Sequence, residues 1–132
     1  DRFVVRFALL PTSNAAHFMF GATGATGATA TGLTAFSVVL NPSAMGQIQG
    51  FPGMTVYNES SNSGLSLSTR HANAVEVVVD GPGVIVRING TLVSQAQIAE
   101  LTAGRVGLVA DLRRADPQLS VRRARILVLP SE

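Results

Sequence analysis

Apolar and polar positions alternate most regularly between residues 74 and 90, AVEVVVDGPGVIVRING. A period of two predicts two strands, and the Gly81-Pro82 pair between them predicts a tight turn that folds one strand back on the other. With a two-residue loop at this turn, Glu76 lies across from Arg87 on one face of the hairpin. The other face is then aliphatic, with Val79 opposite Val84, Val77 opposite Val86 and Val75 opposite Ile88. Pattern, turn and charge therefore indicate the same antiparallel hairpin.

A second turn signal, Asn89-Gly90, follows directly. This dipeptide readily adopts the positive φ angles of a type I′ turn, so we expect residues 91–94 to return beside the strand that ends at Ile88. The next four residues, Ser94-Gln95-Ala96-Gln97, fit a helix capping box. They predict one or two helical turns over residues 95–101, the clearest helical signal in the chain.

Strand patterns also occupy much of the remaining sequence. They cover residues 2–10, 16–22, 33–41, 45–51, 54–57, 65–67, 105–111 and 119–129. The turn signal Asn41-Pro42-Ser43 joins two of these segments and predicts a second hairpin. About ten short strands with turn signals every 8 to 12 residues or so are typical of an antiparallel β-sandwich or jelly roll. The predicted fold class is therefore all-β, with little or no helix.

Two of these strands have distinctive patterns. Residues 105–111 are apolar on both faces, which predicts a central position in a sheet. In residues 119–129, Arg122-Arg123 interrupts the alternation, and a β-bulge at these arginines would restore one inward apolar face.

Two further segments are predicted to be loops. Residues 21–32 read GATGATGATATG, without charges or large side chains, which favours a long surface loop over a collagen-like helix. Residues 58–63 read NESSNS, a polar cluster that predicts a solvated loop.

Composition narrows the class of protein. The chain has 132 residues, of which 46% are hydrophobic and 14% charged, as expected of one folded domain, and we expect it to be an excerpt of a longer protein. No apolar run approaches the roughly 20 residues that span a bilayer, so no transmembrane segment is predicted. All ten basic residues are Arg, which suggests a GC-rich, bacterial coding sequence. The chain has no cysteine, which excludes disulfides and thiolate metal sites.

The C-terminal half, residues 73–130, resembles the closing portion of concanavalin A-like jelly rolls, the group that includes laminin G-like and bacterial 3-keto-disaccharide hydrolase-like domains. The resemblance rests on NAVEVVVDGPGVIVRINGTLV, on GRVGLVAD and on SVRRARILVLP, with GLTAFSVVLNPSAMGQIQGF similar to the strand pair that crosses the concave sheet. The chain departs from the family at Arg122, Arg123 and Ala124, where an aromatic residue and Asp or Asn are usual. The family's aromatic opening strand is also not visible before Arg2. The resemblance implies a fold that hosts lectins, adhesion modules, hydrolases and sensor ectodomains.

No catalytic constellation stands out, and an enzyme is the less favoured prediction. His17 and His71 are the only histidines, and no motif connects them. No two carboxylates form a close pair on one strand, as a glycosidase would require. We expect no cofactor. Calcium stays a candidate because Asp80, Asp111 and Asp116 could supply oxygen ligands as in laminin G-like domains, although turn formation is the favoured explanation of these carboxylates.

Two groups of residues are candidate ligand contacts. Sugar rings stack on exposed aromatics, and the chain has one Tyr and no Trp, so a weak sugar or calcium-dependent site would use Tyr57, Asn58 and Glu59. The arginines near the C-terminus, Arg113, Arg114, Arg123 and Arg125 together with Arg122, could form a basic patch for an anionic glycan, a lipid or an acidic partner. The alternatives without a ligand are an ordinary solvated loop for the first group and a charged, solvent-exposed sheet edge for the arginines. Aromatics are not interleaved with these arginines, which argues against nucleic acid.

Three functional hypotheses follow. We favour a non-catalytic binding module of a bacterial extracytoplasmic, secreted or cell-surface protein that binds a glycan or a protein partner. The second hypothesis is a structural subunit of a filament or shell, an oligomer that completes its sheet with a neighbour's strand. The third is an enzyme of the 3-keto-sugar glycoside hydrolase type. In each, we expect the valine hairpin to be scaffold and the function to lie in residues 23–31, in residues 57–63 or in the C-terminal arginines.

Overall fold

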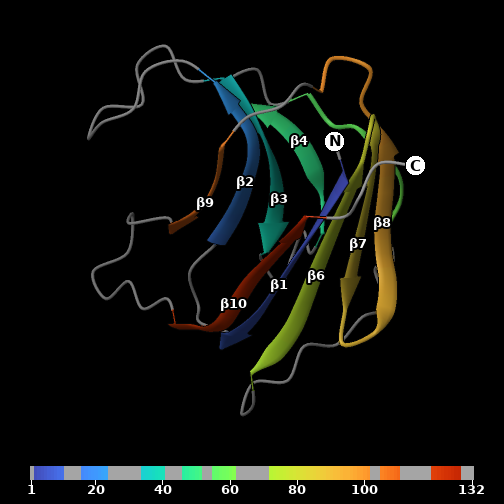
Figure 1. The fold of residues 1–132 in the computed structure, drawn as a ribbon. Coiled ribbons are helices and arrows are strands. Elements are labelled where there is room, and N and C mark those ends of the chain that lie inside the picture. The colour runs from blue at the N-terminus through green and yellow to red at the C-terminus, as the bar shows by residue number, and fades with distance from the viewer. Residues whose placement is uncertain are drawn as a thin grey trace.

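The computed structural model describes residues 2–10, 16–23, 34–40, 46–51, 55–61, 72–101, 105–110 and 120–128, and these form a two-layer β-sandwich (Figure 1). One sheet has six strands in the order β10-β1-β6-β7-β8-β5, and the other has four in the order β4-β3-β2-β9. The strands are β1 Arg2–Leu10, β2 Ala16–Thr23, β3 Thr34–Leu40, β4 Ile48–Phe51, β5 Asn58–Ser61, β6 Asn73–Asp80, β7 Gly83–Ile88, β8 Thr91–Gln97, β9 Arg105–Ala110 and β10 Ser120–Val128. All the strand pairings are antiparallel, which confirms the predicted fold class.

The valine hairpin has the predicted register. Strands β6 and β7 pair Val75 with Ile88, Val77 with Val86 and Val79 with Val84, and these six side chains are buried. Glu76 pairs with Arg87 on the opposite face. Because alternate residues of a strand face opposite sides, one face of the hairpin contributes to the core and the other faces away from it.

The Asn89-Gly90 turn joins β7 to β8 as expected. Both residues have positive φ angles, 52° and 81°. The Asn89 side chain fastens the turn to the start of β6: its Oδ1 accepts a hydrogen bond from the Ala74 amide at 2.9 Å, and its Nδ2 donates to Asn73 Oδ1 at 2.9 Å. Thr91 and Leu92 then pair with Ile88 and Arg87, which confirms the predicted return of the chain.

The helical turns predicted over residues 95–101 were wrong, because β8 continues through Gln97. The Ser94 hydroxyl does not cap a helix but donates to the Gly46 carbonyl at 2.5 Å. Ser94, Ala96 and Ile98 are buried, so their alternation places one face of the strand in the core. Core packing therefore decides the conformation of a segment whose local pattern fits a helix start.

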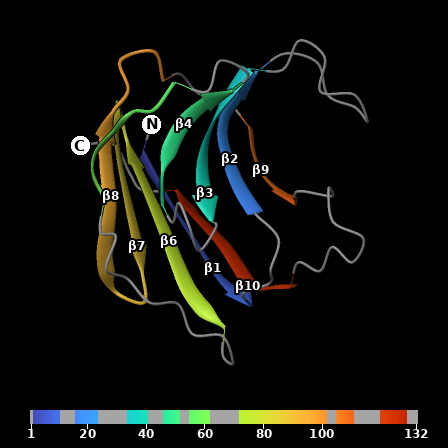
Figure 2. The same ribbon diagram turned by 180° about the vertical axis from the view of Figure 1, so that it is seen from behind.

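The core lies between the sheets and contains a row of aromatic rings. Phe7 of β1 contacts Phe18 of β2 with ring centroids 5.9 Å apart, and the row continues through Phe20 and Phe36 to Tyr57, with centroid distances of 6.2, 5.8 and 5.7 Å. The prediction that Phe18 and Phe20 point into the core is confirmed. Seen from behind, β6, β7 and β8 of the six-stranded sheet lie on one side, and β2, β3 and β9 of the four-stranded sheet lie on the other (Figure 2).

Three strand assignments differ from the sequence predictions. The polar loop predicted at residues 58–63 begins as strand β5, which forms the edge of the six-stranded sheet beside β8, so backbone pairing outweighs side-chain polarity here. Strand β9 was expected in the centre of a sheet but lies at the end of the described four-stranded sheet. The strand predicted at residues 54–57 is reduced to a bridge between Gln49 and Val56. The hairpin predicted at residues 41–43 is confirmed by the β3–β4 pairing.

Strand β10 contains the predicted bulge, which places its apolar residues on one inward side, but Ile126 and Val128 on that side are exposed. Arg6 pairs with Arg125 and Ala8 with Arg122, so two residues of β10 lie opposite Phe7. Beyond the bulge, Ile126 and Val128 are 55% and 81% exposed. Their partners on β1, Val5 and Phe3, belong to the core or pack against it. The inward face of β10 is therefore left uncovered by the four-stranded sheet.

Candidate functional site

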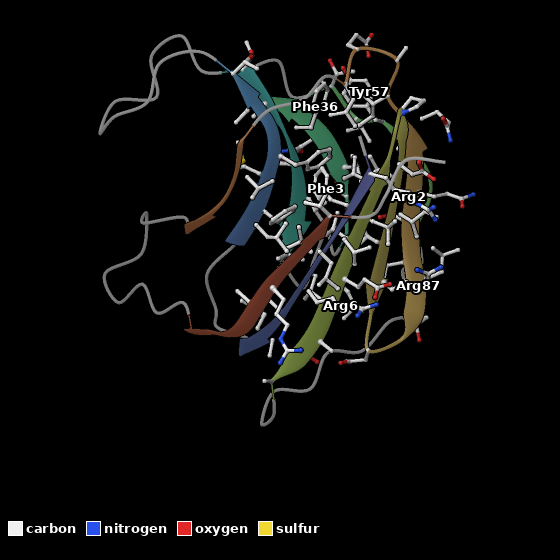
Figure 3. The ribbon with its side chains drawn as sticks, viewed as in Figure 1. Arg2, Phe3, Arg6, Phe36, Tyr57 and Arg87 are labelled. Atoms are coloured by element: carbon white, nitrogen blue, oxygen red, sulfur yellow. The ribbon has the colours of Figure 1, made fainter. Side chains whose placement is uncertain are left out.

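An open groove of about 590 Å³ crosses the outer face of the six-stranded sheet. Its described lining comes from β1, β6, β7, β8 and the turn after β6, namely Arg2, Val4, Arg6, Glu76, Val78, Asp80, Gly83, Val84, Ile85, Arg87, Gln95, Ala96 and Gln97. Figure 3 shows Arg2, Arg6 and Arg87 on this sheet, whereas Phe36 and Tyr57 lie between the sheets. The groove therefore uses the side of the valine hairpin that faces away from the core.

A row of charged residues crosses one part of this face. The strand registers place Arg125 beside Arg6, Arg6 beside Glu76 and Glu76 beside Arg87, so four neighbouring strands each contribute one charge. Arg6 Nε donates to Glu76 Oε2 at 2.7 Å, and Arg87 Nη1 donates to Glu76 Oε1 at 3.0 Å. Each carboxylate oxygen thus accepts from a different arginine. We call Arg125, Arg6, Glu76 and Arg87 the arginine row.

The arginines set the charge state of Glu76. The hydrogen bond from Arg6 lowers the pKa of the Glu76 carboxyl below its ordinary value, burial opposes this shift, and Arg87 lowers the pKa further. The charged form of Glu76 is therefore favoured, and this form holds both guanidinium groups in place.

The groove floor is apolar and its far rim is polar. Val4, Val78 and Ile85 are neighbours in the strand register and form the floor beside the arginine row. On the far side, Arg2 Nε lies 3.4 Å from Asp80 Oδ2 and makes no hydrogen bond with any described residue. This arrangement can bind a molecule that has an apolar face and hydrogen-bonding edges.

A second hollow of about 430 Å³ continues the groove across the arginine row. It shares Arg6, Glu76 and Arg87 with the first and adds Arg125 of β10. The two hollows together extend across β10, β1, β6, β7 and β8, a width suited to an extended ligand.

The candidate residues from the sequence do not gather at one site. Arg125 is exposed and lines the second hollow, while Tyr57 packs edge-on against Phe36 of the core and over Gly50. Asn58 and Glu59 lie in β5, at the opposite edge of the six-stranded sheet from β10. Arg122 and Arg123 lie in β10 at the bulge. Two candidates, Arg113 and Arg114, fall outside the described residues, as do His71, Asp111, Asp116 and most of the GAT-containing segment.

The sequence prediction missed the groove because it treated the valine hairpin as scaffold. Arg2 and Arg6 alternate with buried residues of β1, and Glu76 and Arg87 occupy the outward face of the predicted hairpin. The sequence did contain a signal for the groove, because charged residues occupy the outward-facing positions of β1 and of the valine hairpin. What the pattern could not reveal was that β1 and β6 are neighbours.

The two carboxylates of the groove are not arranged for glycoside hydrolysis. Glu76 and Asp80 are four residues apart on β6, which corresponds to about 13 Å along a strand. Glycosidases use carboxylates separated by about 5 to 9.5 Å. Each groove carboxylate also pairs with an arginine. Within the described ranges, His, Asp and Glu form no cluster of three that could hold a metal ion, and no helix is long and apolar enough to cross a membrane.

The loss of the Glu76 charge should make stability depend on pH. The pKa of Glu76 in the folded protein lies below its value in the unfolded chain, so the carboxylate stabilises the fold above about pH 4.5. This stabilisation disappears as the pH falls from that value through the lower folded-state pKa. Glu76→Gln should therefore lose less stability than the wild type between pH 6 and pH 3, measured by urea denaturation at each pH. Arg6→Gln, which removes the main cause of the shift, should also flatten the profile; parallel profiles for all three proteins would contradict the assignment.

Comparison with known proteins identifies the fold but no family. No family model and no curated protein matches the chain. A solved structure, a protein of unknown function with a galectin-like fold from Bacillus subtilis, matches with a TM-score of 0.71 and 13% identity over 95% of this chain and 71% of the other. At this identity the similarity establishes a shared fold alone. It supports a galectin-like β-sandwich, of the jelly-roll type expected from the concanavalin A-like resemblance, while the laminin G-like or hydrolase-like subgroup stays a prediction.

Proposed function

We propose that this chain is a non-catalytic binding module that holds an extended glycan in the groove across the outer face of the six-stranded sheet. The observation that carries the proposal is the groove itself, with its floor of Val4, Val78 and Ile85 beside arginine, glutamine and carboxylate side chains. Sugar rings have apolar C–H faces and hydroxyl edges, so they match such a surface. We propose that the module belongs to a bacterial secreted or cell-surface protein; its arginine-only basic residues support the bacterial origin.

A glycan suits this groove better than a folded protein does. Protein interfaces bury about 800 Å² per partner. The described lining of the groove mixes single aliphatic side chains with charged ones. A slender chain with many hydroxyl groups makes better use of this surface than a broad apolar contact.

The proposal can be tested with wild-type protein and two matched variants. A glycan array followed by NMR titration of the best ligand should shift the amide resonances of Val78, Ile85 and Gln95. Val78→Arg places a long charged side chain on the groove floor and should abolish these shifts. Val56→Arg makes the same change at an exposed valine outside the groove and should leave them unchanged. Failure of every glycan to bind, with a protein partner captured instead, would reject the glycan in favour of an interaction role.

A second candidate function, a structural subunit that adds a neighbour's strand, is favoured by strand β10. This strand ends the described six-stranded sheet and exposes Ile126, Leu127 and Val128. An unpaired, apolar strand edge is a template for another strand. Under this proposal the wild type forms assemblies whose mass increases with concentration in light scattering, and Leu127→Lys dissociates them. A wild type that stays monomeric at all concentrations would exclude it.

A further inference from the structure

Positively charged residues outnumber negatively charged ones around the groove. The two hollows together include four described arginines, Arg2, Arg6, Arg87 and Arg125, and two carboxylates, Glu76 and Asp80, which leaves two net positive charges. The whole chain has a formal net charge of +2. All other residues of the chain therefore sum to zero, and the excess positive charge of the protein is concentrated at this face.

All of that excess lies in the arginine row. Arg2 and Asp80 form an ion pair and balance each other. In the arginine row, Arg6 and Arg87 share the carboxylate of Glu76, while Arg125 lies beside Arg6 and pairs with no carboxylate among the described residues. The row thus contains three guanidinium groups and one carboxylate.

The guanidinium groups of the arginine row retain donors for a ligand. A guanidinium has five N–H groups, and Arg6 and Arg87 each use one nitrogen to reach Glu76. Glu76 accepts from both and so fixes the two side chains at the outer face. Arginines that are held in place lose less conformational entropy when they bind an anion, and planar carboxylates accept two parallel hydrogen bonds from one guanidinium.

We propose that the groove binds an acidic polysaccharide, with a uronate carboxylate placed between Arg125, Arg6 and Arg87 and the adjoining sugar rings on the floor of Val4, Val78 and Ile85. The inference rests on the proposed function and adds the ligand class. Glu76 is a positioning residue, because each of its oxygens accepts a hydrogen bond from one arginine and thereby orients the two guanidinium groups.

The hollows beside the arginines favour a polysaccharide over an anionic membrane. Arg6 and Arg87 line the hollows together with Val78 and Ala74, which belong to the sheet surface itself. A flat bilayer contacts projecting side chains, whereas a chain one sugar wide can lie along the sheet. Vesicle binding therefore serves as a competing outcome in the test.

The test uses three probes with isothermal titration calorimetry: tetragalacturonate, its fully methyl-esterified neutral form, and a sulfated oligosaccharide of equal length. Tetragalacturonate should bind at least about tenfold more tightly than the ester, a difference of about 1.4 kcal/mol. Raising the salt from 50 to 500 mM should weaken binding of the acid and leave that of the ester unchanged, because screening acts on charges.

Arg125→Gln is the informative variant, because Arg125 is exposed and forms no ion pair with another residue of the described ranges. It should reduce the affinity for tetragalacturonate about tenfold and leave the affinity for the ester unchanged. Arg105→Gln removes the same charge from β9 of the other sheet and should change neither affinity.

The outcomes separate this inference from the proposed function. Equal binding of acid and ester, unaffected by Arg125→Gln, would overturn the uronate site while the glycan-binding function stands. Absence of binding to these probes and to every glycan on an array would overturn both. Binding only to the sulfated probe, or only to phosphatidylglycerol vesicles, would overturn the uronate assignment.

Discussion

Phe20→Ala should lower the free energy of unfolding by about 3–5 kcal/mol, the range for a fully buried phenylalanine whose removal leaves a cavity. Phe20 has no exposed surface and lies between Phe18 and Phe36, with ring centroids 6.2 and 5.8 Å away. Its neighbours are themselves packed in the aromatic row and have little room to close the gap. Since domains of this size are stable by about 5–15 kcal/mol, one substitution would remove a large share of the total.

Urea denaturation followed by circular dichroism measures this effect. Leu92→Ala is the matched control, because Leu92 is also a large apolar residue in a strand but is 44% exposed. It should change stability by no more than about 0.5 kcal/mol. Equal losses of unfolding free energy in the two variants would mean that the aromatic row does not stabilise the core more than an exposed side chain does.

Gly46→Ala should cost about 2–5 kcal/mol, because two separate effects add. Gly46 has a φ angle of 79°, a region that costs other residues about 1–2 kcal/mol. A methyl group at this position would also approach Val93 Cγ1 to 2.5 Å, closer than two carbons can pack. Val93 is buried, and relief of such overpacking typically costs about 1–3 kcal/mol.

The control for Gly46 is Gly81→Ala in the turn of the valine hairpin. Gly81 has a φ angle of 56°, but no atom lies within 4 Å of the position where a methyl group would be added. Only the backbone effect, about 1–2 kcal/mol, should therefore appear in its denaturation curve. If Gly46→Ala is no less stable than Gly81→Ala, then Val93 of β8 does not pack against Gly46 as described.

Local patterns predicted the local parts of the fold. The β6–β7 register and the Asn89-Gly90 turn depend on residues close in sequence, whose alternation and turn chemistry act within the hairpin itself. The sheet to which each strand belongs, in contrast, depends on contacts between residues that are distant in sequence. Strands β1 and β2 are consecutive and similar in pattern, yet they belong to opposite sheets, and nothing local to either segment fixes this.

In the candidate site, too, contacts between residues close in sequence could be predicted, and contacts between distant residues could not. Glu76 and Arg87 are eleven positions apart, and their contact could be predicted from the hairpin. Arg6 and Glu76 are seventy positions apart, and their shorter contact arises only because β1 pairs with β6. Arg125 was selected as part of a C-terminal patch, but its partner across the strands is Arg6, and it lines the second hollow together with Ala74. The groove is a product of strand order, which a single sequence does not encode in any one segment.

The position of β1 also has a consequence for the order of folding. This strand lies between β6 and β10, so both of its partners are distant in sequence, whereas β6, β7 and β8 are joined by short turns. Closing long loops is entropically costly and slow, so we expect the β6–β8 meander to form first and to serve as the template on which β1 and then β10 assemble. Until β6 has been synthesised, Phe3, Val5 and Phe7 have no strand to pair with in this sheet, and a nascent chain halted before residue 73 would present them to chaperones.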